Sequence, residues 1–219
     1  MSGTPVHDSG KGRVVSVNVS LALTVESPGG PVTTGIFKQS VAGKIPLRGV
    51  NLLGDEQADR SVHGGPDRAV YAYAAEDYEW WREVLRRPLS PGRFGENLTV
   101  SGIDVSGALI GERWRVGSAI LQVAAPRIPC YKLALALGDP HFTKTFAQAL
   151  RPGSYMSVVA EGEIAAGDAV EIVSRPAHGL TVAKMARIFL FERSRLREML
   201  VAPELPISWR DWVVEQVAT

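Results

Sequence analysis

The segment APRIPCYKL, residues 125–133, holds Cys130, the only cysteine in the 219-residue chain. A lone cysteine most often packs as a small buried side chain. Here the preceding stretch AILQVAA is typical of a strand, so Cys130 is expected at a strand exit, where functional residues gather. Arg127 and Lys132 add positive charge that favours a thiolate, the form that attacks electrophiles and binds metals. The residues alone leave two interpretations open, a packing residue and a functional thiolate.

The usual partners of a reactive cysteine are not readable near it. The four histidines, at positions 7, 63, 141 and 178, are scattered, so the sequence places none of them beside Cys130 as a catalytic base. No clustered Cys or His ligands predict a zinc site, and one cysteine cannot hold an iron–sulfur cluster, which needs about four thiolates. Nucleotide-binding glycine motifs and the G-x-S-x-G motif of serine hydrolases are also missing from the sequence.

A second candidate is the motif HGGPDR, residues 63–68. Its Gly-Gly-Pro-Asp core is typical of a turn, and the simplest interpretation is a connection before the strand AVYAY. The functional interpretation is an anion cradle. Two glycines let backbone N–H groups approach a ligand closely, and His63 and Arg68 add donors.

A third candidate is GRFGENLTV, residues 92–100, where Gly95 precedes the polar pair Glu96 and Asn97 at a predicted strand entrance. An Asn-mediated turn explains this pattern without a ligand. In the functional interpretation, Asn97 donates to and accepts from a polar heterocycle while Glu96 accepts. Lys38, in the segment GIFKQSV, is most simply a solvated surface residue on a short strand.

Short strands with Gly and Pro turns dominate the chain as far as residue 176, with helical stretches beginning near Ala75 and at KLALAL. This pattern favours a β-barrel or packed sheets with a few helices, an α+β fold that is mainly β. Beyond it, apolar residues at three-to-four spacing predict three short helices, either a small module or a cover on the barrel. Their expected N-caps are Thr181, Ser194 and Ser208. The predicted domains are residues 13–176 and 178–219.

Composition excludes some classes of protein. The net charge is +1, so no overall field favours a nucleic acid polymer or an anionic membrane surface. No apolar run approaches about twenty residues, and no apolar signal segment follows Met1, so neither a membrane span nor secretion is predicted. With one cysteine, no intramolecular disulfide can form, and we expect a cytoplasmic protein.

Five segments together resemble the MOSC domain, the molybdenum cofactor sulfurase C-terminal family. They are GIFK, ADRSVHGGPDRAVYAY, FGENLTVSG, IGERWRVGSAILQV and PRIPCYK, which occur in the family's order and at its spacing. The resemblance covers roughly residues 13–175. The helical piece that follows resembles the three-helix extension of the YiiM-like branch. The fold implied is a distorted β-barrel with flanking helices and a small C-terminal three-helix module.

The resemblance implies that the Cys130 thiolate ligates the molybdenum of a bound molybdenum cofactor (molybdopterin). A thiolate is the soft ligand that such a metal prefers. The cofactor's phosphate would suit backbone N–H groups and Arg or Lys, and its pterin has mixed donors and acceptors. The resemblance assigns the cofactor cleft to Lys38, His63, Gly64, Gly65, Asp67, Arg68, Phe94, Glu96, Asn97, Arg127 and Lys132.

The activity implied is that of an oxidoreductase, the reduction of small N-hydroxylated compounds, such as hydroxylamino purine bases, to amines. The chain shows no flavin or nicotinamide fingerprint and cannot ligate its own iron–sulfur cluster with cysteines, so a separate electron-donor protein is expected. Two other classes stay open. One is a sulfur carrier with a persulfide on Cys130, and the other is a module that binds the cofactor or another anion without turnover.

Overall fold

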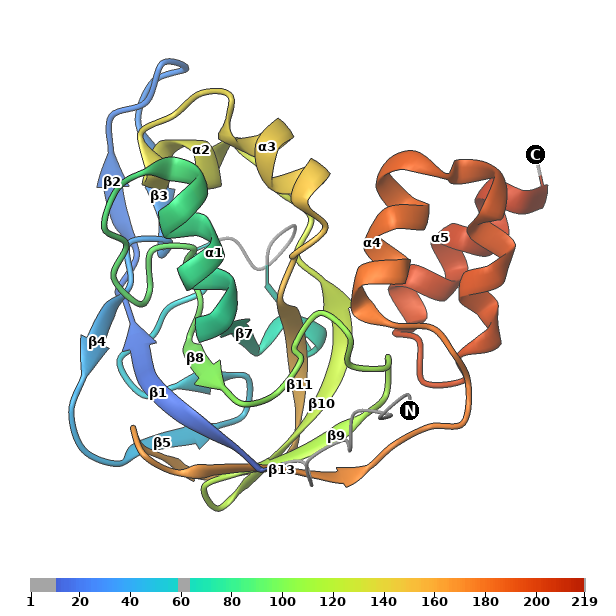
Figure 1. Cartoon of the computed structure of the whole chain (residues 1–219), viewed down its shortest axis with the longest axis horizontal. Coiled ribbons are helices and arrows are strands. Elements are labelled where there is room, and N and C mark those ends of the chain that lie inside the picture. The colour runs from blue at the N-terminus through green and yellow to red at the C-terminus, as the bar shows by residue number, and fades with distance from the viewer. Residues whose placement is uncertain (1–10, 59–63, 219) are drawn as a thin grey trace, which may run out of the picture.

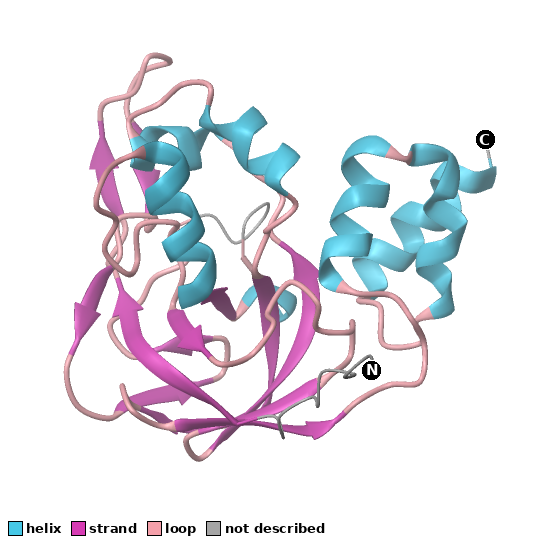
Figure 2. Ribbon diagram, viewed as in Figure 1, coloured by secondary structure: helices cyan, strands magenta, loops and turns pink. Residues whose placement is uncertain are grey.

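The computed structural model of the chain describes residues 11–58 and 64–218. His7 and His63, both considered in the sequence, lie outside these ranges. Most strands lie in the lower part of the molecule, β2 and β3 stand beside α1 and α2, and the longer helices gather in two groups, α1–α3 at one end of the strands and α4 with α5 beside them (Figures 1 and 2).

Seven strands close into a barrel, because the first and last of them pair with each other. Neighbouring strands are antiparallel except β7 and β8, which are parallel. A further short strand, β4 (Gln39–Val41), pairs with the outer edge of β1. In barrel order the strands are β13 (Ala169–Ser174), β9 (Arg113–Val116), β10 (Ala119–Pro126), β11 (Ser154–Ala160), β7 (Val70–Ala74), β8 (Leu98–Ser101) and β1 (Lys11–Val19).

The remaining elements cover the barrel. Two small sheets pair β12 (Gly162–Ile164) with β5 (Ile45–Arg48) and β6 (Asn51–Leu52), and β2 (Leu23–Val25) with β3 (Val32–Thr34). The helices are η1 (Pro66–Arg68), α1 (Ala75–Leu85), α2 (Tyr131–Leu137), α3 (Phe142–Ala149), α4 (Val182–Phe191), η2 (Arg193–Val201) and α5 (Ile207–Ala218), where η marks a 3₁₀ helix.

Several local predictions are confirmed. The change from strand to helix falls at Ala75, and β9 and β10 form a hairpin around Gly117, with Val116 opposite Ala119. The stretch GIFKQSV is extended only from Gln39 onward. Before it, the Lys38 amide bonds to the Ile36 carbonyl at 2.9 Å, a tight turn that replaces the expected strand.

The C-terminal helices confirm one predicted cap and correct two. Thr181 caps α4, accepting a hydrogen bond from the Lys184 amide at 3.0 Å. The Ser194 prediction was wrong, because η2 already begins at Arg193, and the middle helix is 3₁₀ rather than α. Ser208 was also wrong, because α5 begins one residue earlier, at Ile207, after a proline.

The buried apolar residues form two clusters. The larger runs from the barrel interior, including Trp114 and Val123, to Met185, Ile188 and Val213 of the C-terminal helices. Helix α4 contacts β10 directly, so the C-terminal helices cover the barrel. The smaller cluster is mainly aromatic and joins α1, α2 and α3 to β7, and its largest members are Tyr71, Tyr73, Tyr78, Trp81, Phe94, Phe142 and Phe146.

Candidate functional site

A cleft of about 110 Å³ lies where the loops around positions 35, 56, 96 and 128 meet the start of β7. These loops are far apart in sequence and come together because the strands that carry them are neighbours in the barrel. Of the eleven proposed site residues that the structure describes, six line the cleft. Those that line it are Lys38, Arg68, Asn97, Arg127, Cys130 and Lys132.

Cys130 follows the end of β10 and precedes the first turn of α2. The strand-exit position expected from the sequence is therefore the one observed. The thiol is free and half-buried on the wall of the cleft. Within the described part of the chain, no three His, Cys, Asp or Glu side chains are grouped to hold a metal ion.

Arg127 is a buried cation, with only 7% of its surface exposed. Its guanidinium lies 5.1 Å from the centre of the Tyr71 ring, and Nη1 donates a long hydrogen bond of 3.4 Å to the Tyr155 hydroxyl. Its Nε is buried and has no hydrogen-bond partner, and no ion pair joins Arg127 to any residue that the structure describes. A buried charge without a counterion is costly, so this side chain is suited to an anion that enters the cleft.

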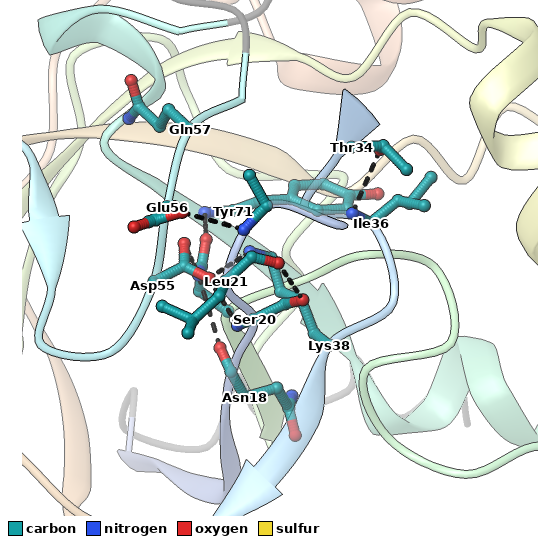
Figure 3. A network of polar contacts seen from close by, with 12 residues as sticks. Asn18, Ser20, Leu21, Thr34, Ile36, Lys38, Asp55, Glu56, Gln57 and Tyr71 are labelled. Carbon is teal, nitrogen blue, oxygen red and sulfur yellow. Dashed lines mark hydrogen bonds and ion pairs between the residues drawn. The ribbon is translucent and has the colours of Figure 1, made fainter. Parts of the chain in front are cut away.

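Lys38 is not the solvated residue that its sequence context suggested. Its side chain is 8% exposed, and Nζ lies 2.5 Å from the Asp55 carboxylate. Burial lowers the pKa of Lys38, opposed by the negative charge of Asp55. Asp55 also accepts hydrogen bonds from the Ser20 amide and from Asn97 Nδ2, both at 2.9 Å. Figure 3 shows the surroundings of this network, with Lys38, Asp55 and Ser20 close together.

The polar atoms of Asn97 are already used within the protein. Its Oδ1 accepts from the Tyr71 amide at 3.0 Å, and its Nδ2 donates to Asp55 and, at 3.3 Å, to the Asn18 carbonyl. Asn97 therefore fixes the wall of the cleft by joining β7 and β8 to the loop that carries Asp55. Hydrogen bonding to a heterocycle, as the sequence suggested, would require Asn97 to share these bonds.

Glu96 and Phe94 lie behind the wall of the cleft rather than in it. Glu96 is fully buried and its carboxylate accepts four hydrogen bonds, from the Tyr78 hydroxyl, the Thr99 hydroxyl and the amides of Gly92 and Phe94. Burial raises the pKa of Glu96, and the bonds from Tyr78 and Thr99 oppose that shift. The Phe94 ring belongs to the aromatic cluster. Both residues shape the loop that carries Gly95 and Asn97.

Among its described residues, 64–68, the HGGPDR motif lines the cleft only at Arg68. Arg68 lines it, whereas Gly64 and Asp67 line a separate small cavity beside Trp209. Gly65 has φ 103°, a conformation that favours glycine, and its amide donates to Gln57 Oε1 at 3.0 Å. His63, the remaining residue of the motif, lies outside the described residues.

The structure adds cleft residues that the sequence did not reveal. Asp55 and Gln57 come from a loop between β6 and η1, and Tyr71 and Tyr155 come from adjacent barrel strands. The two tyrosine rings lie 5.0 Å apart, between centres. Acidic residues on polar loops and tyrosines on strands are common in any sequence. Only the three-dimensional structure therefore shows that these residues line the cleft.

Comparison with known proteins shows the family to which the chain belongs. The sequence matches the MOSC domain over residues 59–171. The chain belongs to the MOSC domain family. It is 38% identical over 200 residues to the uncharacterized protein YflK of Bacillus subtilis, covering 90% of each chain. It is 31% identical over 186 residues to a protein of Gibberella moniliformis named a reductase, covering 82% of this chain and 33% of that protein.

The fold agrees with the family assignment. The crystal structure of YiiM from Geobacillus stearothermophilus has a TM-score of 0.77 with this chain at 31% identity, and the match covers 94% of this chain and 98% of that one. This MOSC domain protein lies in the YiiM-like branch, and its distorted barrel with flanking helices is the α+β fold that the sequence predicted. Among residues 11–58 and 64–218, no helix is both long and apolar enough to cross a bilayer.

Proposed function

We propose that this protein binds the molybdenum cofactor in the cleft and reduces small N-hydroxylated compounds. The observation that carries the proposal is the pairing in one cleft of a half-buried thiol, Cys130, with a buried guanidinium, Arg127, that has no counterion among the described residues. A thiol supplies the soft ligand that molybdenum needs, and an unpaired cation supplies the charge that a phosphate needs. The ligand expected for a MOSC domain, the molybdenum cofactor, contains both the metal and the phosphate.

The donor set fits the cofactor on chemical grounds. Arg68, Arg127 and Lys132, which all line the cleft, would hold its phosphate by charge-assisted hydrogen bonds. The Lys38–Asp55 pair is neutral overall and offers both a donor and an acceptor to the pterin. The cofactor, when bound, supplies a redox-active metal for the removal of an oxygen atom.

The overall reaction fixes what the protein must provide. Reduction of an N-hydroxylamine breaks the N–O bond, consumes two electrons and two protons, and releases an amine and water. The chain has one cysteine and no flavin or nicotinamide fingerprint, so the electrons would come from a separate donor protein. Cationic side chains around the cleft would hold the anionic cofactor in place. The name of the Gibberella relative supports a reductase. The single cysteine favours a cytoplasmic location.

The proposal is tested by turnover. Protein from a cofactor-producing host, supplied with a reconstituted electron-transfer chain, is expected to convert a hydroxylamino purine to the aminopurine, and Cys130→Ala is expected to give no product. A wild-type protein that carries cofactor but forms no amine would be a binding module rather than a reductase.

The half-buried, free thiol also suits a sulfur carrier, which is the second candidate. Intact-mass spectrometry after incubation with a cysteine desulfurase separates the two. Sulfur added to Cys130 in protein that holds no molybdenum would favour the carrier, whereas bound molybdenum and an unchanged mass would favour the reductase.

A further inference from the structure

A second, larger cavity of about 440 Å³ adjoins the cleft. Cys130, Arg68, Ile128 and Tyr155 line both spaces, so the two meet at the proposed metal ligand. Its volume lies within the range of small-molecule sites, about 300–1,000 Å³. The cavity lies between the barrel mouth and the C-terminal helices, the two parts that stand side by side in Figure 1.

Three aromatic rings from the C-terminal helices form one wall of this second cavity. Phe189 comes from α4, and Trp209 and Trp212 come from the first turns of α5. The Phe189 ring centre lies 5.1 Å from that of Trp209 and 5.2 Å from that of Trp212, and the two indoles are 5.9 Å apart and nearly perpendicular. Each ring is therefore fixed by the other two.

The three rings are partly exposed rather than fully buried, so part of their aromatic surface is not covered by their packing against each other. The Arg193 guanidinium lies 4.2 Å from the centre of the Phe189 ring and 5.1 Å from that of Trp212 and so stacks on the pair. Tyr155 and the segment 128–130 also line the cavity. A pre-formed slot with aromatic walls and a few polar groups, here Arg68 and Ser208, is typical of a site for a flat ring.

We infer that this cavity binds the aromatic ring of a planar heteroaromatic substrate, with Trp212 and Trp209 as its stacking surface. The inference rests on the proposed function, because it adds a substrate subsite to the same centre. The polar cleft would then hold the anionic cofactor, while the C-terminal helices select the substrate. Trp212 and Trp209 are positioning residues and not catalytic ones, since they would act on the ring and not on the N–O bond.

Ring binding can be measured without turnover. Equilibrium dialysis with adenine, a planar base that has no N–O bond, is expected to show binding to the wild-type protein. In Trp212→Leu the affinity should fall about ten-fold, the size of one lost base–aromatic stack. Trp212→Phe should recover most of it. Trp80→Leu is the matched control, because Trp80 is also half-buried but lies on α1 against Arg151.

Kinetics give a second readout. Trp212→Leu should raise KM for phenylhydroxylamine about ten-fold and leave kcat unchanged, whereas KM for N-methylhydroxylamine, which has no ring, should not change. Equal adenine affinity in wild type and Trp212→Leu would overturn the inference. So would loss of molybdenum and pterin from Trp212→Leu, which would place the pterin on these rings. If the wild type reduces neither compound but Trp212→Leu still has a lower affinity for adenine, the ring site is supported and the proposed reductase activity is contradicted.

Discussion

Asp55 is the residue on which the polar wall of the cleft depends most. Its carboxylate, 4% exposed, faces the buried ammonium of Lys38 and accepts bonds from the Ser20 amide and the Asn97 side chain. Arg127, the other buried cation of the cleft, has no such partner among the described residues. Of these two buried cations, Lys38 therefore stabilises the fold, whereas Arg127 is available to bind a ligand.

Asp55→Ala should therefore destabilise the fold by about 3–5 kcal/mol, because it leaves the Lys38 charge buried and unpaired. Urea unfolding followed by circular dichroism measures this. The matched control is Glu56→Ala, the neighbouring carboxylate, which is exposed and accepts a hydrogen bond from the Ala22 amide; its cost should stay within about 0.5 kcal/mol. Equal urea unfolding midpoints for the two variants would show that the buried Lys38 does not need Asp55 as its ion-pair partner.

At the scale of elements, the loop between α1 and β8 places Asn97 at the cleft, and Glu96 holds that loop from inside. Its carboxylate joins the Tyr78 hydroxyl of α1 and the Thr99 hydroxyl of β8 to the amides of Gly92 and Phe94. The loop bends at Gly92 and Gly95, whose φ angles of 85° and 75° favour glycine.

Glu96→Ala should cost about 3–5 kcal/mol, because buried donors lose their acceptor. Glu96→Gln should cost only about 1–2 kcal/mol, because the amide oxygen can keep the three bonds of Oε1 and lose only the 3.2 Å bond from the Phe94 amide. If Glu96→Gln keeps its cofactor, Glu96 shapes the loop. Loss of cofactor at unchanged thermal stability would mean that the carboxylate contacts the ligand itself.

Much of this element-scale picture could be predicted from the sequence, because it is local. Strand alternation, the switch to helix at Ala75 and the Thr181 cap each depend on residues a few positions apart. The position of Cys130 at a strand exit followed in the same way. The sequence did not predict which side chains face the cleft, because that depends on how strands distant in sequence pair with each other. Asp55 opposite Lys38 and Tyr155 beside Tyr71 are pairings of this kind.

Over the whole molecule, the barrel and the C-terminal helices share one apolar cluster. We predicted residues 13–176 and 178–219 as two domains, and this packing favours their unfolding together. Met185, fully buried on α4, is a member of that cluster.

Met185→Ala should destabilise the chain by about 2–5 kcal/mol. The loss should appear in a single transition, observed both by far-ultraviolet circular dichroism and by the assigned fluorine NMR resonance of Trp114, inside the barrel, in fluorotryptophan-labelled protein. Arg187→Ala, exposed on the same helix, should change stability by less than about 0.5 kcal/mol. Two separate transitions, with the Trp114 signal unmoved by Met185→Ala, would show that the helices fold as an independent domain.

The central claim is that Cys130 is the protein ligand of molybdenum, and the metal content of Cys130→Ala tests it most directly. Wild-type protein and Cys130→Ala would be purified from the same cofactor-producing host, and molybdenum measured by mass spectrometry beside pterin fluorescence and the unfolding midpoint. We predict stoichiometric molybdenum and pterin in the wild type, and loss of molybdenum in a Cys130→Ala protein that is still folded. Equal molybdenum in both proteins, or a wild type with neither metal nor pterin, would contradict the claim.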